Sequence, residues 1–505
     1  MKNRSKKILS CGIFLCILYV IFLKITYLFS ETGYNRLNIV GIKEEEPLDM
    51  VYVGASAAFV YWQPLKAWND CGFASYSYAT VGLPAESIKY YIEEVLKTQD
   101  PELLVIDARP FQLWTENEDV KFRHGSDSMD YSLNRFSLVK SYLHGRTDAE
   151  EVDVLSYYLQ IIKYHTNYKK VLSNEENWKM INNKGESKYK GWTFMEYHCP
   201  LEEPEAFETD ECAELLEGSR KILDDLLAYC KEKELKVLFV VCPYSITKGD
   251  QKTYNTIQKI VEEEGFDFLN TNLYFNEMNL DFQTDFNDYN HVNCFGAEKY
   301  TDFLEKYLME NYHLPDRRGE ALYASWNDLY AEFKEDEVIT KMNVQQMIDV
   351  KRQGEEAAEL LPMVSDPMQW AVLADNCNFT ILISTVGEWK GDNIDFHAIM
   401  NQFGISDKEE KFCLKIISGQ DDGLVDIMSA DNIEESCDIG EEGIRQGQSH
   451  VEIASGEKGY LSVNGVEYVF EEDGVYIGVY NNNTNQMIDM VKINCQGNGI
   501  QFEHY

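Results

Sequence analysis

Short β-rich runs, continuously apolar at 103–106 and nearly so at 235–242, recur between residues 48 and 309 and alternate with longer amphipathic stretches. A strand with one solvated face alternates polar and apolar residues, whereas uninterrupted apolar runs indicate strands covered on both faces. The amphipathic stretches between them favour parallel pairing, because a crossover helix returns the chain to the same end of the sheet. The sequence therefore predicts an α/β domain with strands at about 48–53, 73–79, 103–107, 235–242 and 266–269.

The domain organisation follows from where this alternation stops. Residues 109–207 are rich in Tyr, Lys, Asn and Trp, carry a helical pattern at 152–165 and are too long for a loop, so they predict a helical insertion. We expect the sheet domain to span 48–314. Around it we expect a polar stalk at 31–47, a helical linker at 315–374 and a β-rich accessory domain at 375–505.

The N-terminus predicts a membrane anchor. Lys2, Arg4, Lys6 and Lys7 precede an apolar run from residue 8 to residue 29, and about 20 such residues cross a bilayer as a helix. Its one charge, Lys24, lies near the far end, where its stem can snorkel toward the headgroups. The basic flank places the N-terminus in the cytoplasm and the rest outside, in a single-pass cell-membrane protein. A cleaved signal peptide is the alternative, but no small-x-small cleavage site follows.

Charge and cysteine content narrow the classes of partner. The chain has 46 Lys and Arg against 86 Asp and Glu, a net charge of −40, which disfavours nucleic acid as a partner. Its 12 cysteines include no C-x-x-C pair, so zinc ribbons and thioredoxin-type redox motifs are not expected. Cys242 and Cys294 are expected to be small buried residues, and disulfide pairing stays open. No metal or organic cofactor is expected.

Three separated residues predict a nucleophilic site. Ser56 follows the first predicted strand at a strand-to-helix turn, at the carboxyl edge of the sheet. Asp288 and His291 precede the last predicted helix, where the chain returns to that edge. Each has a plainer explanation alone: a helix-capping serine, a solvated loop acid and a surface histidine. Together they predict a site in which the carboxylate orients an imidazole that takes the serine proton.

Ser56 after the first strand and the D-x-x-H of residues 288–291 before the last helix resemble the SGNH/GDSL hydrolase superfamily over residues 48–308. The layout is similar to that of membrane-anchored D-alanyl-lipoteichoic-acid transfer and alginate-acetylation proteins. The resemblance implies a three-layer, flavodoxin-like domain with Ser56 as nucleophile, His291 as base and Asp288 as its orienter. It also implies that Gly82, in the turn after the second strand, is an oxyanion-hole residue.

The sequence departs from that family at two motifs. The usual G-D-S is G-A-S here, with Ala55 before the serine, and the G-x-N-D expected after the third strand is absent. Arg109 stands nearby as a substitute oxyanion or substrate-binding group. The equal alternative is a structural ion pair between Asp107 and Arg109 at the root of the insertion.

Two further regions have residues suited to binding. The insertion carries a polar cluster and several aromatic residues, which suit sugar stacking or core packing equally: Arg123, His124, Asp127, Asp130, Tyr131, Asn134, Arg135, Trp178, Tyr189, Trp192 and Tyr197. Near the C-terminus, β-rich runs at 475–481 and 488–494 flank an Asn-rich turn and predict a hairpin. This pattern is similar to interleukin-like EMT inducer domains, which implies a glycan-binding or interaction module. A generic β-sandwich is the alternative.

The function we expect is acyl-ester chemistry on a cell-surface polysaccharide, by an extracellular serine esterase or acyltransferase. Whether water or a sugar hydroxyl accepts the acyl group stays open. Expected partners are the glycopolymer or its acyl donor, the membrane and an acyl-exporting membrane protein. The alternatives are a non-catalytic glycan-binding or assembly protein built on the same scaffold, and an adhesin that depends on the C-terminal domain.

Overall fold

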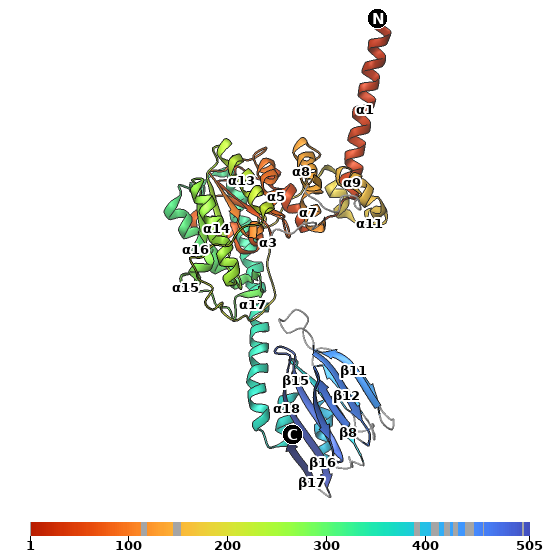
Figure 1. Ribbon diagram of the computed structural model, residues 1–505. Helices are drawn as coiled ribbons and strands as arrows, with labels where there is room; N and C mark the ends of the chain where they lie inside the picture. The colour runs from red at the N-terminus through yellow and green to blue at the C-terminus, as the bar shows by residue number, and fades with distance from the viewer. Residues whose placement is uncertain are drawn as a thin grey trace. The chain divides into compact units, whose positions relative to one another are not determined.

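The computed structural model describes residues 2–112, 119–144, 153–387, 394–405, 414–418, 425–427, 433–439, 449–457, 459–496 and 499–505. The chain divides into two compact units, the first ending at Val344 and the second beginning at Gln345. Figure 1 shows the elements of both units, which are described in turn.

Unit 1 is built on a five-stranded parallel sheet, which confirms the predicted α/β class. The strand order β2-β1-β3-β4-β5 is that of a doubly wound, flavodoxin-like sheet. Every residue of the first four strands is buried, as the apolar runs at β3 and β4 indicated and although β2 contains Ser75 and Ser77. The strands are β1 (Met50–Gly54), β2 (Ser75–Ala79), β3 (Leu103–Asp107), β4 (Val237–Val241) and β5 (Asp267–Asn270).

Two groups of helices enclose this sheet (Figure 1). One group comprises α3 (Ser56–Tyr61), α4 (Pro64–Cys71) and α16 (Cys294–Asn311), and the other α5 (Ala85–Val95), α6 (Arg109–Gln112), α13 (Glu217–Glu232) and α14 (Lys248–Glu263). Because α3 and α5 both contact β1 but belong to different groups, the sheet is covered on both faces.

The expected insertion contains short helices rather than long ones. The helical pattern at 152–165 is divided into α9 and α10, and Val152 lies outside the described residues. The elements are α7 (Asp119–Ser126), α8 (Leu133–His144), α9 (Val154–Tyr158), α10 (Ile161–Tyr164), η2 (His165–Asn167), α11 (Tyr168–Ser173), α12 (Glu175–Lys179) and η3 (Met180–Asn182).

Residues 31–47, expected as a polar stalk, instead pack onto the domain. They contain helix α2 (Tyr34–Gly41), which contacts β2, and the short helix η1 (Ile42–Glu44). Two of their buried polar side chains form hydrogen bonds within the domain: the Arg36 guanidinium donates to Asn183 Oδ1 at 3.1 Å, and Asn38 Nδ2 donates to the Gly191 carbonyl at 3.1 Å. Part of the polar composition there therefore reflects buried hydrogen bonds and not solvent exposure.

The N-terminal apolar run forms one helix, α1 (Lys2–Phe29). Its segment from Lys6 to Phe29 contains an 18-residue window with a mean hydropathy of 2.6 and is long and apolar enough to cross a membrane, a test that signal sequences also pass. Lys24, expected to snorkel toward headgroups, donates a hydrogen bond to Asn182 Oδ1 at 2.6 Å.

Unit 2 is β-rich, as predicted, and its described strands form two sheets. The six-stranded sheet has the order β10-β9-β8-β15-β16-β17 and the four-stranded sheet β11-β12-β13-β14. The hairpin expected around the Asn-rich turn is present, with Val475 paired to Ile493. The strands are β8 (Phe379–Val386), β9 (Leu414–Ser418), β10 (Val425–Ile427), β11 (Ile433–Ile439), β12 (Ser449–Ser455), β13 (Gly459–Val463), β14 (Val466–Phe470), β15 (Gly474–Asn481), β16 (Gln486–Gln496) and β17 (Gly499–His504).

The expected helical linker is divided between the two units. Helix α17 (Ala324–Leu360) contains the boundary at Val344, and α18 (Pro367–Ala374) belongs to unit 2. In unit 1, Trp326 packs against Trp68 with ring centroids 5.2 Å apart. In unit 2, Trp370 of α18 and residues of α19 (Ile394–Gln402) join the core beneath the six-stranded sheet.

Among the described cysteines none forms a disulfide. Cys242 and Cys294 are buried, as expected, and burial raises the pKa of each thiol to about 12.

Candidate active site

Ser56 is placed by a tight junction at the carboxyl edge of the sheet. Strand β1 ends at Gly54, and a Cβ built at that position would lie 2.3 Å from Asp107 Cβ, so only glycine fits beside β3. The Asp107 carboxylate then accepts a hydrogen bond from the Ala55 backbone N–H at 3.3 Å. Helix α3 begins at the next residue, and this junction fixes where Ser56 stands.

The structure brings Ser56, His291 and Asp288 into one hydrogen-bonded chain. Ser56 Oγ lies 2.7 Å from His291 Nε2, and His291 Nδ1 lies 2.9 and 3.0 Å from the two carboxylate oxygens of Asp288. Asp288 ends strand β6 (Phe286–Asp288) and His291 begins strand β7 (His291–Val292), and the two residues pair across this small hairpin. Local strand pairing thus holds acid and histidine together, while Ser56 comes from 235 residues away.

The charge on Asp288 sets the histidine tautomer. Burial would raise the pKa of Asp288, but the hydrogen bond and charge of His291 and the Asn290 N–H, which donates at 2.8 Å, together hold that pKa below its ordinary value. An ionised carboxylate only accepts hydrogen bonds, so His291 Nδ1 carries a proton toward it. In the neutral imidazole Nε2 is then the acceptor facing Ser56.

Arg109 holds the loop that carries the acid and the histidine. Its guanidinium donates to the Asn290 carbonyl at 2.9 Å and lies over the Tyr244 ring, 4.6 Å from its centroid. The Tyr61 hydroxyl lies 2.9 Å from the same carbonyl oxygen. Asn290 sits between Asp288 and His291, so these contacts position the hairpin.

Two roles were expected for Arg109, an oxyanion or substrate-binding group and the partner of Asp107 in an ion pair. Neither role describes its contacts fully. The described structure contains no ion pair between Arg109 and Asp107 within 4 Å; Asp107 instead accepts the backbone N–H of Arg109 at 3.0 Å. Burial raises the pKa of Asp107, and the charge of Arg109 opposes that rise. Arg109 does line the pocket, but its guanidinium hydrogen bonds are directed to Asn290.

A cavity of about 370 Å³ opens beside Ser56. Gly82 lines it at a φ of +62°, a conformation that favours glycine, and a Cβ there would lie 2.4 Å from Lys121 Cδ. The lining of the cavity combines apolar and polar residues, among them Ser56, Val81, Gly82, Leu83, Pro84, Ala85, Asp107, Arg109, Pro110, Lys121, Asn290 and His291. Such a mixture of apolar and polar surface is typical of small-molecule sites.

Sequence reasoning missed Lys121, Tyr61 and Asn290. Asn290 lies within the motif that was singled out, so its position next to His291 was a usable signal. Lys121 and Tyr61 lie on α7 and α3 with no distinguishing pattern, and only the fold brings them to the pocket and the loop.

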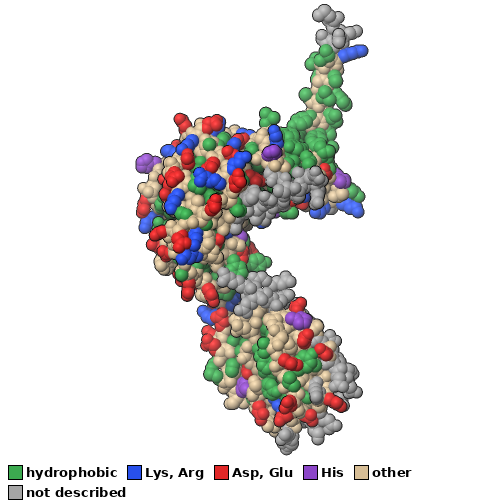
Figure 2. Space-filling model, in the orientation of Figure 1, with side chains coloured by type: hydrophobic (Ala, Val, Ile, Leu, Met, Phe, Trp, Pro, Cys, Tyr) green, Lys and Arg blue, Asp and Glu red, His purple; other side chains and the backbone are tan. Residues whose placement is uncertain are grey.

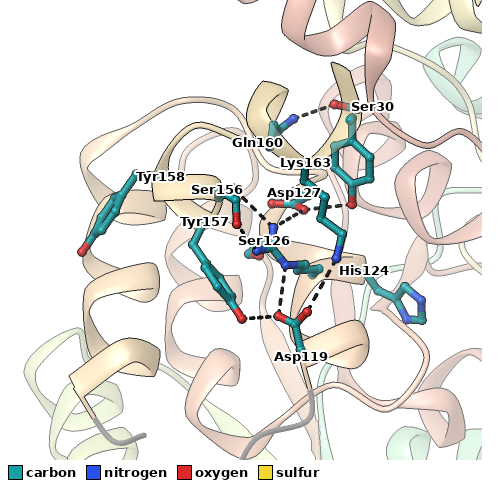
Figure 3. Close-up of polar contacts among 12 residues, drawn as sticks. Ser30, Asp119, His124, Ser126, Asp127, Ser156, Tyr157, Tyr158, Gln160 and Lys163 are labelled. Atoms are coloured by element: carbon teal, nitrogen blue, oxygen red, sulfur yellow. Dashed lines mark hydrogen bonds and ion pairs between the residues drawn. The ribbon is translucent and has the colours of Figure 1, made fainter. Parts of the chain in front are cut away.

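Part of the polar cluster of the insertion forms a network around Asp127 (Figure 3), whereas Asp130 and Asn134 have other partners, Lys43 and Glu94. Arg123 and Arg135 both bond the Asp127 carboxylate, at 3.3 Å each, and Lys163 and Tyr157 contact Asp119. Among the aromatic residues, Tyr189 and Trp192 pack in the core, whereas Trp178 and Tyr197 are exposed. For the buried pair, core packing is therefore the explanation.

One carboxylate group in the described residues has the spacing of a metal site: Asp70, Asp302 and Glu305. Lys66 Nζ forms ion pairs with all three, so a cation of the protein already occupies their centre. Burial raises the pKa of Glu305 to about 7. This group lies outside the pocket that contains Ser56.

No protein-family model matches the chain, and no curated protein matches it. The chemistry of the site therefore has to be inferred from its geometry.

Proposed function

We propose that this protein is a membrane-anchored serine esterase or acyltransferase of SGNH type that acts on acyl esters of cell-surface polysaccharide. The observation that carries the proposal is the hydrogen-bonded chain from Ser56 Oγ through His291 to Asp288, which ends in a cavity of about 370 Å³. A serine is a weak nucleophile until an adjacent base takes its proton, and this arrangement supplies that base.

The chemical steps follow from these contacts. Ser56 Oγ attacks the ester carbonyl carbon as its proton passes to His291 Nε2, and Asp288 stabilises the resulting imidazolium. The carbonyl oxygen becomes an oxyanion, and collapse breaks the ester bond as His291 returns the proton to the leaving alcohol. Water or a sugar hydroxyl then attacks the acyl-Ser56 ester by the reverse sequence, which frees the serine.

Two backbone donors are available for the oxyanion. Within the described part of the chain, neither the Ser56 nor the Gly82 backbone N–H donates a hydrogen bond, and both residues line the pocket. A preorganised N–H pair at the reacting carbonyl stabilises developing negative charge. We assign these two groups to the oxyanion hole, with Arg109 as a positioning residue.

The membrane anchor is supported by how α1 ends. Thr26, Tyr27, Leu28 and Ser30 are buried, and Asn177 Nδ2 donates to the Leu28 carbonyl at 3.0 Å. Removing a signal peptide up to this point would expose the surface that covers these residues, so we propose that α1 is retained. The basic residues before it place the N-terminus in the cytoplasm and both units outside.

A second function has one specific observation in its favour. Arg109 directs its guanidinium to Asn290, so the site lacks a side-chain substitute for the missing Asn motif. A scaffold with a weakened oxyanion hole would bind glycan without turning it over, and the β-rich unit 2, with its resemblance to interleukin-like EMT inducer domains, would serve such binding.

The test is ester turnover by the full-length protein in detergent, with p-nitrophenyl acetate as the donor and with or without an acceptor polysaccharide. We expect Ser56→Ala to abolish turnover and Ser245→Ala, a serine in the loop after β4, to retain it. Acyl transfer to the polysaccharide distinguishes transferase from esterase. Absence of turnover by the folded wild type, with retained glycan binding, would favour the non-catalytic scaffold.

A further inference from the structure

The end of α1 is held by the helical insertion through a set of polar contacts. Gln160 Nε2 donates to Ser30 Oγ at 2.7 Å, as Figure 3 shows, and Asn167 Nδ2 donates to the Phe29 carbonyl at 3.0 Å. Carbonyl groups in the last turn of a helix have no partner within the helix, and the insertion supplies one. Helices α10, α11, α12 and η3 all contact α1.

The exposed part of α1 is too short to cross a bilayer. From Ile8 to Ile21 every residue is exposed, and these 14 residues rise about 21 Å as a helix. The hydrocarbon core of a bilayer is about 30 Å thick. The missing length corresponds to about six residues, so the membrane has to reach the segment from Phe22 to Tyr27.

The insertion contacts that segment, which is partly buried at Phe22 and Lys24 and exposed at Ile25. Tyr131 packs edge-on against Phe22, with ring centroids 5.8 Å apart, and its N–H donates to the Tyr27 hydroxyl at 3.2 Å. Lys24 is bonded to Asn182. A bilayer that covers Phe22 to Tyr27 therefore meets the insertion at the depth of its headgroups.

The insertion carries the side chains that suit this depth. Leu133, Tyr168 and Trp178 are 87%, 50% and 51% exposed, and the latter two lie on helices that contact α1. Figure 2 shows hydrophobic side chains along α1 and gathered where it joins the body of unit 1. Large apolar residues exposed beside a membrane helix, Tyr and Trp among them, are typical of the membrane–water interface.

The charge of this region is opposite to that of the chain. Residues 161–184 contain five lysines (163, 169, 170, 179 and 184) and two acidic residues, Glu175 and Glu176, in a chain of net charge −40. Two of these lysines pair with acids outside this range, Lys163 with Asp119 and Lys184 with Glu44. Lysines at a membrane surface are attracted to anionic headgroups, whereas an acidic surface is repelled.

We propose that the helical insertion is a membrane seat: its helices α10 to α12 and the start of α8 lie in the headgroup layer of an anionic phospholipid bilayer around the base of α1. This inference rests on the proposed anchoring by α1. The seat holds the catalytic pocket at the membrane surface, because Val81 of the pocket donates its N–H to Asn35 Oδ1 at 2.9 Å. Asn35 is five residues beyond Ser30, at most about 18 Å of chain.

The test is photolabelling of the full-length protein in vesicles of phosphatidylcholine and phosphatidylglycerol (7:3), with a phospholipid that carries a diazirine near its headgroup. Mass spectrometry of the peptides locates the adducts. We expect adducts in α1, in residues 161–184 and around Leu133, and none in α16, which belongs to the helix group on the other face of the sheet from α5, the helix that contacts α8.

Two variants separate the seat from the anchor. Replacing Lys169, Lys170 and Lys179 by Gln lowers labelling of the insertion by about fivefold or more, because each lysine near an anionic surface contributes about that factor, and leaves labelling of α1 unchanged. Lys306→Gln, at an exposed lysine of α16, is the control and changes neither. Vesicles of phosphatidylcholine alone reproduce the effect of the triple variant.

Each outcome decides between the two proposals. Adducts in α1 but none in the insertion would overturn the membrane seat and leave the anchor standing. Adducts in neither would overturn the anchor, and the seat with it. Labelling of the insertion that does not respond to the lysine variant or to neutral vesicles would overturn the role of anionic lipid.

Discussion

The pocket beside Ser56 and the polar core of the insertion contain similar residues in different arrangements. In the pocket, a linear series of hydrogen bonds runs from the partly exposed Asp288 carboxylate through His291 to the Ser56 hydroxyl, which lies beside a cavity. In the insertion, Arg123 and Arg135 close on a buried Asp127. A network closed on itself stabilises the fold, whereas one that ends at a cavity can act on a ligand.

Among the tests of this comparison, replacement of His291, the proposed base, has the largest expected effect. His291→Ala removes the acceptor of the Ser56 proton, so we expect the rate of covalent labelling by a fluorophosphonate to fall by about 10³-fold. His313→Ala, an exposed histidine after α16, is the matched control and labels like wild type. Equal rates for both variants would show that His291 does not act as a base.

Asp288→Asn is expected to lower the labelling rate by about 10²-fold or more, because an amide no longer fixes the tautomer or stabilises the imidazolium.

The lowered pKa of Asp288 also contributes stability. A group whose folded-state pKa is depressed stabilises the protein above its ordinary pKa of about 4 and loses that contribution as the pH falls through the lowered value. The stability difference between wild type and Asp288→Asn should therefore shrink at acid pH, as urea unfolding at several pH values would measure.

In the insertion the same kind of change should affect stability alone. Arg135→Ala leaves a buried acid and several carbonyls with fewer partners, and we expect it to lower the free energy of unfolding by about 3 kcal/mol. Arg220→Ala, which breaks an exposed pair with Asp224, should change it by less than about 0.5 kcal/mol. The rate of fluorophosphonate labelling of the folded Arg135→Ala protein should match that of wild type. A large loss of labelling would show that the network around Asp127 also affects the reactivity of Ser56.

Arg109→Met tests positioning against oxyanion binding. If Arg109 only holds the Asn290 carbonyl, which Tyr61 also contacts, ester turnover should fall by about tenfold, and Arg109→Lys should recover part of it. Loss of an oxyanion donor costs about 10²- to 10³-fold. A loss of turnover of that size would show that Arg109 stabilises the oxyanion.

Local patterns made the sheet and the candidate site predictable. Residues 48–53 and 235–242 are apolar enough to require burial on both faces, and β1 and β4 lie within them. Ser56, Asp288 and His291 each lie next to a predicted element, so the geometry of a parallel sheet was enough to place them at one edge.

Long-range polar pairing was not predictable. Helix α2 looks polar because Arg36 and Asn38 find partners about 150 residues away, and Arg109 finds Asn290 at a separation of 181 residues. Nothing in the local sequence of these residues specifies their partners, and a buried polar side chain resembles an exposed one until its partner is known.

The most direct test of Ser56 as the nucleophile is the location of the fluorophosphonate adduct on the folded, full-length protein. Peptide mass spectrometry should find one phosphonylated serine, Ser56, in wild type and none in Ser56→Ala. An adduct on a different serine, or no adduct on folded wild-type protein under conditions that label a control serine hydrolase, would contradict the proposed site.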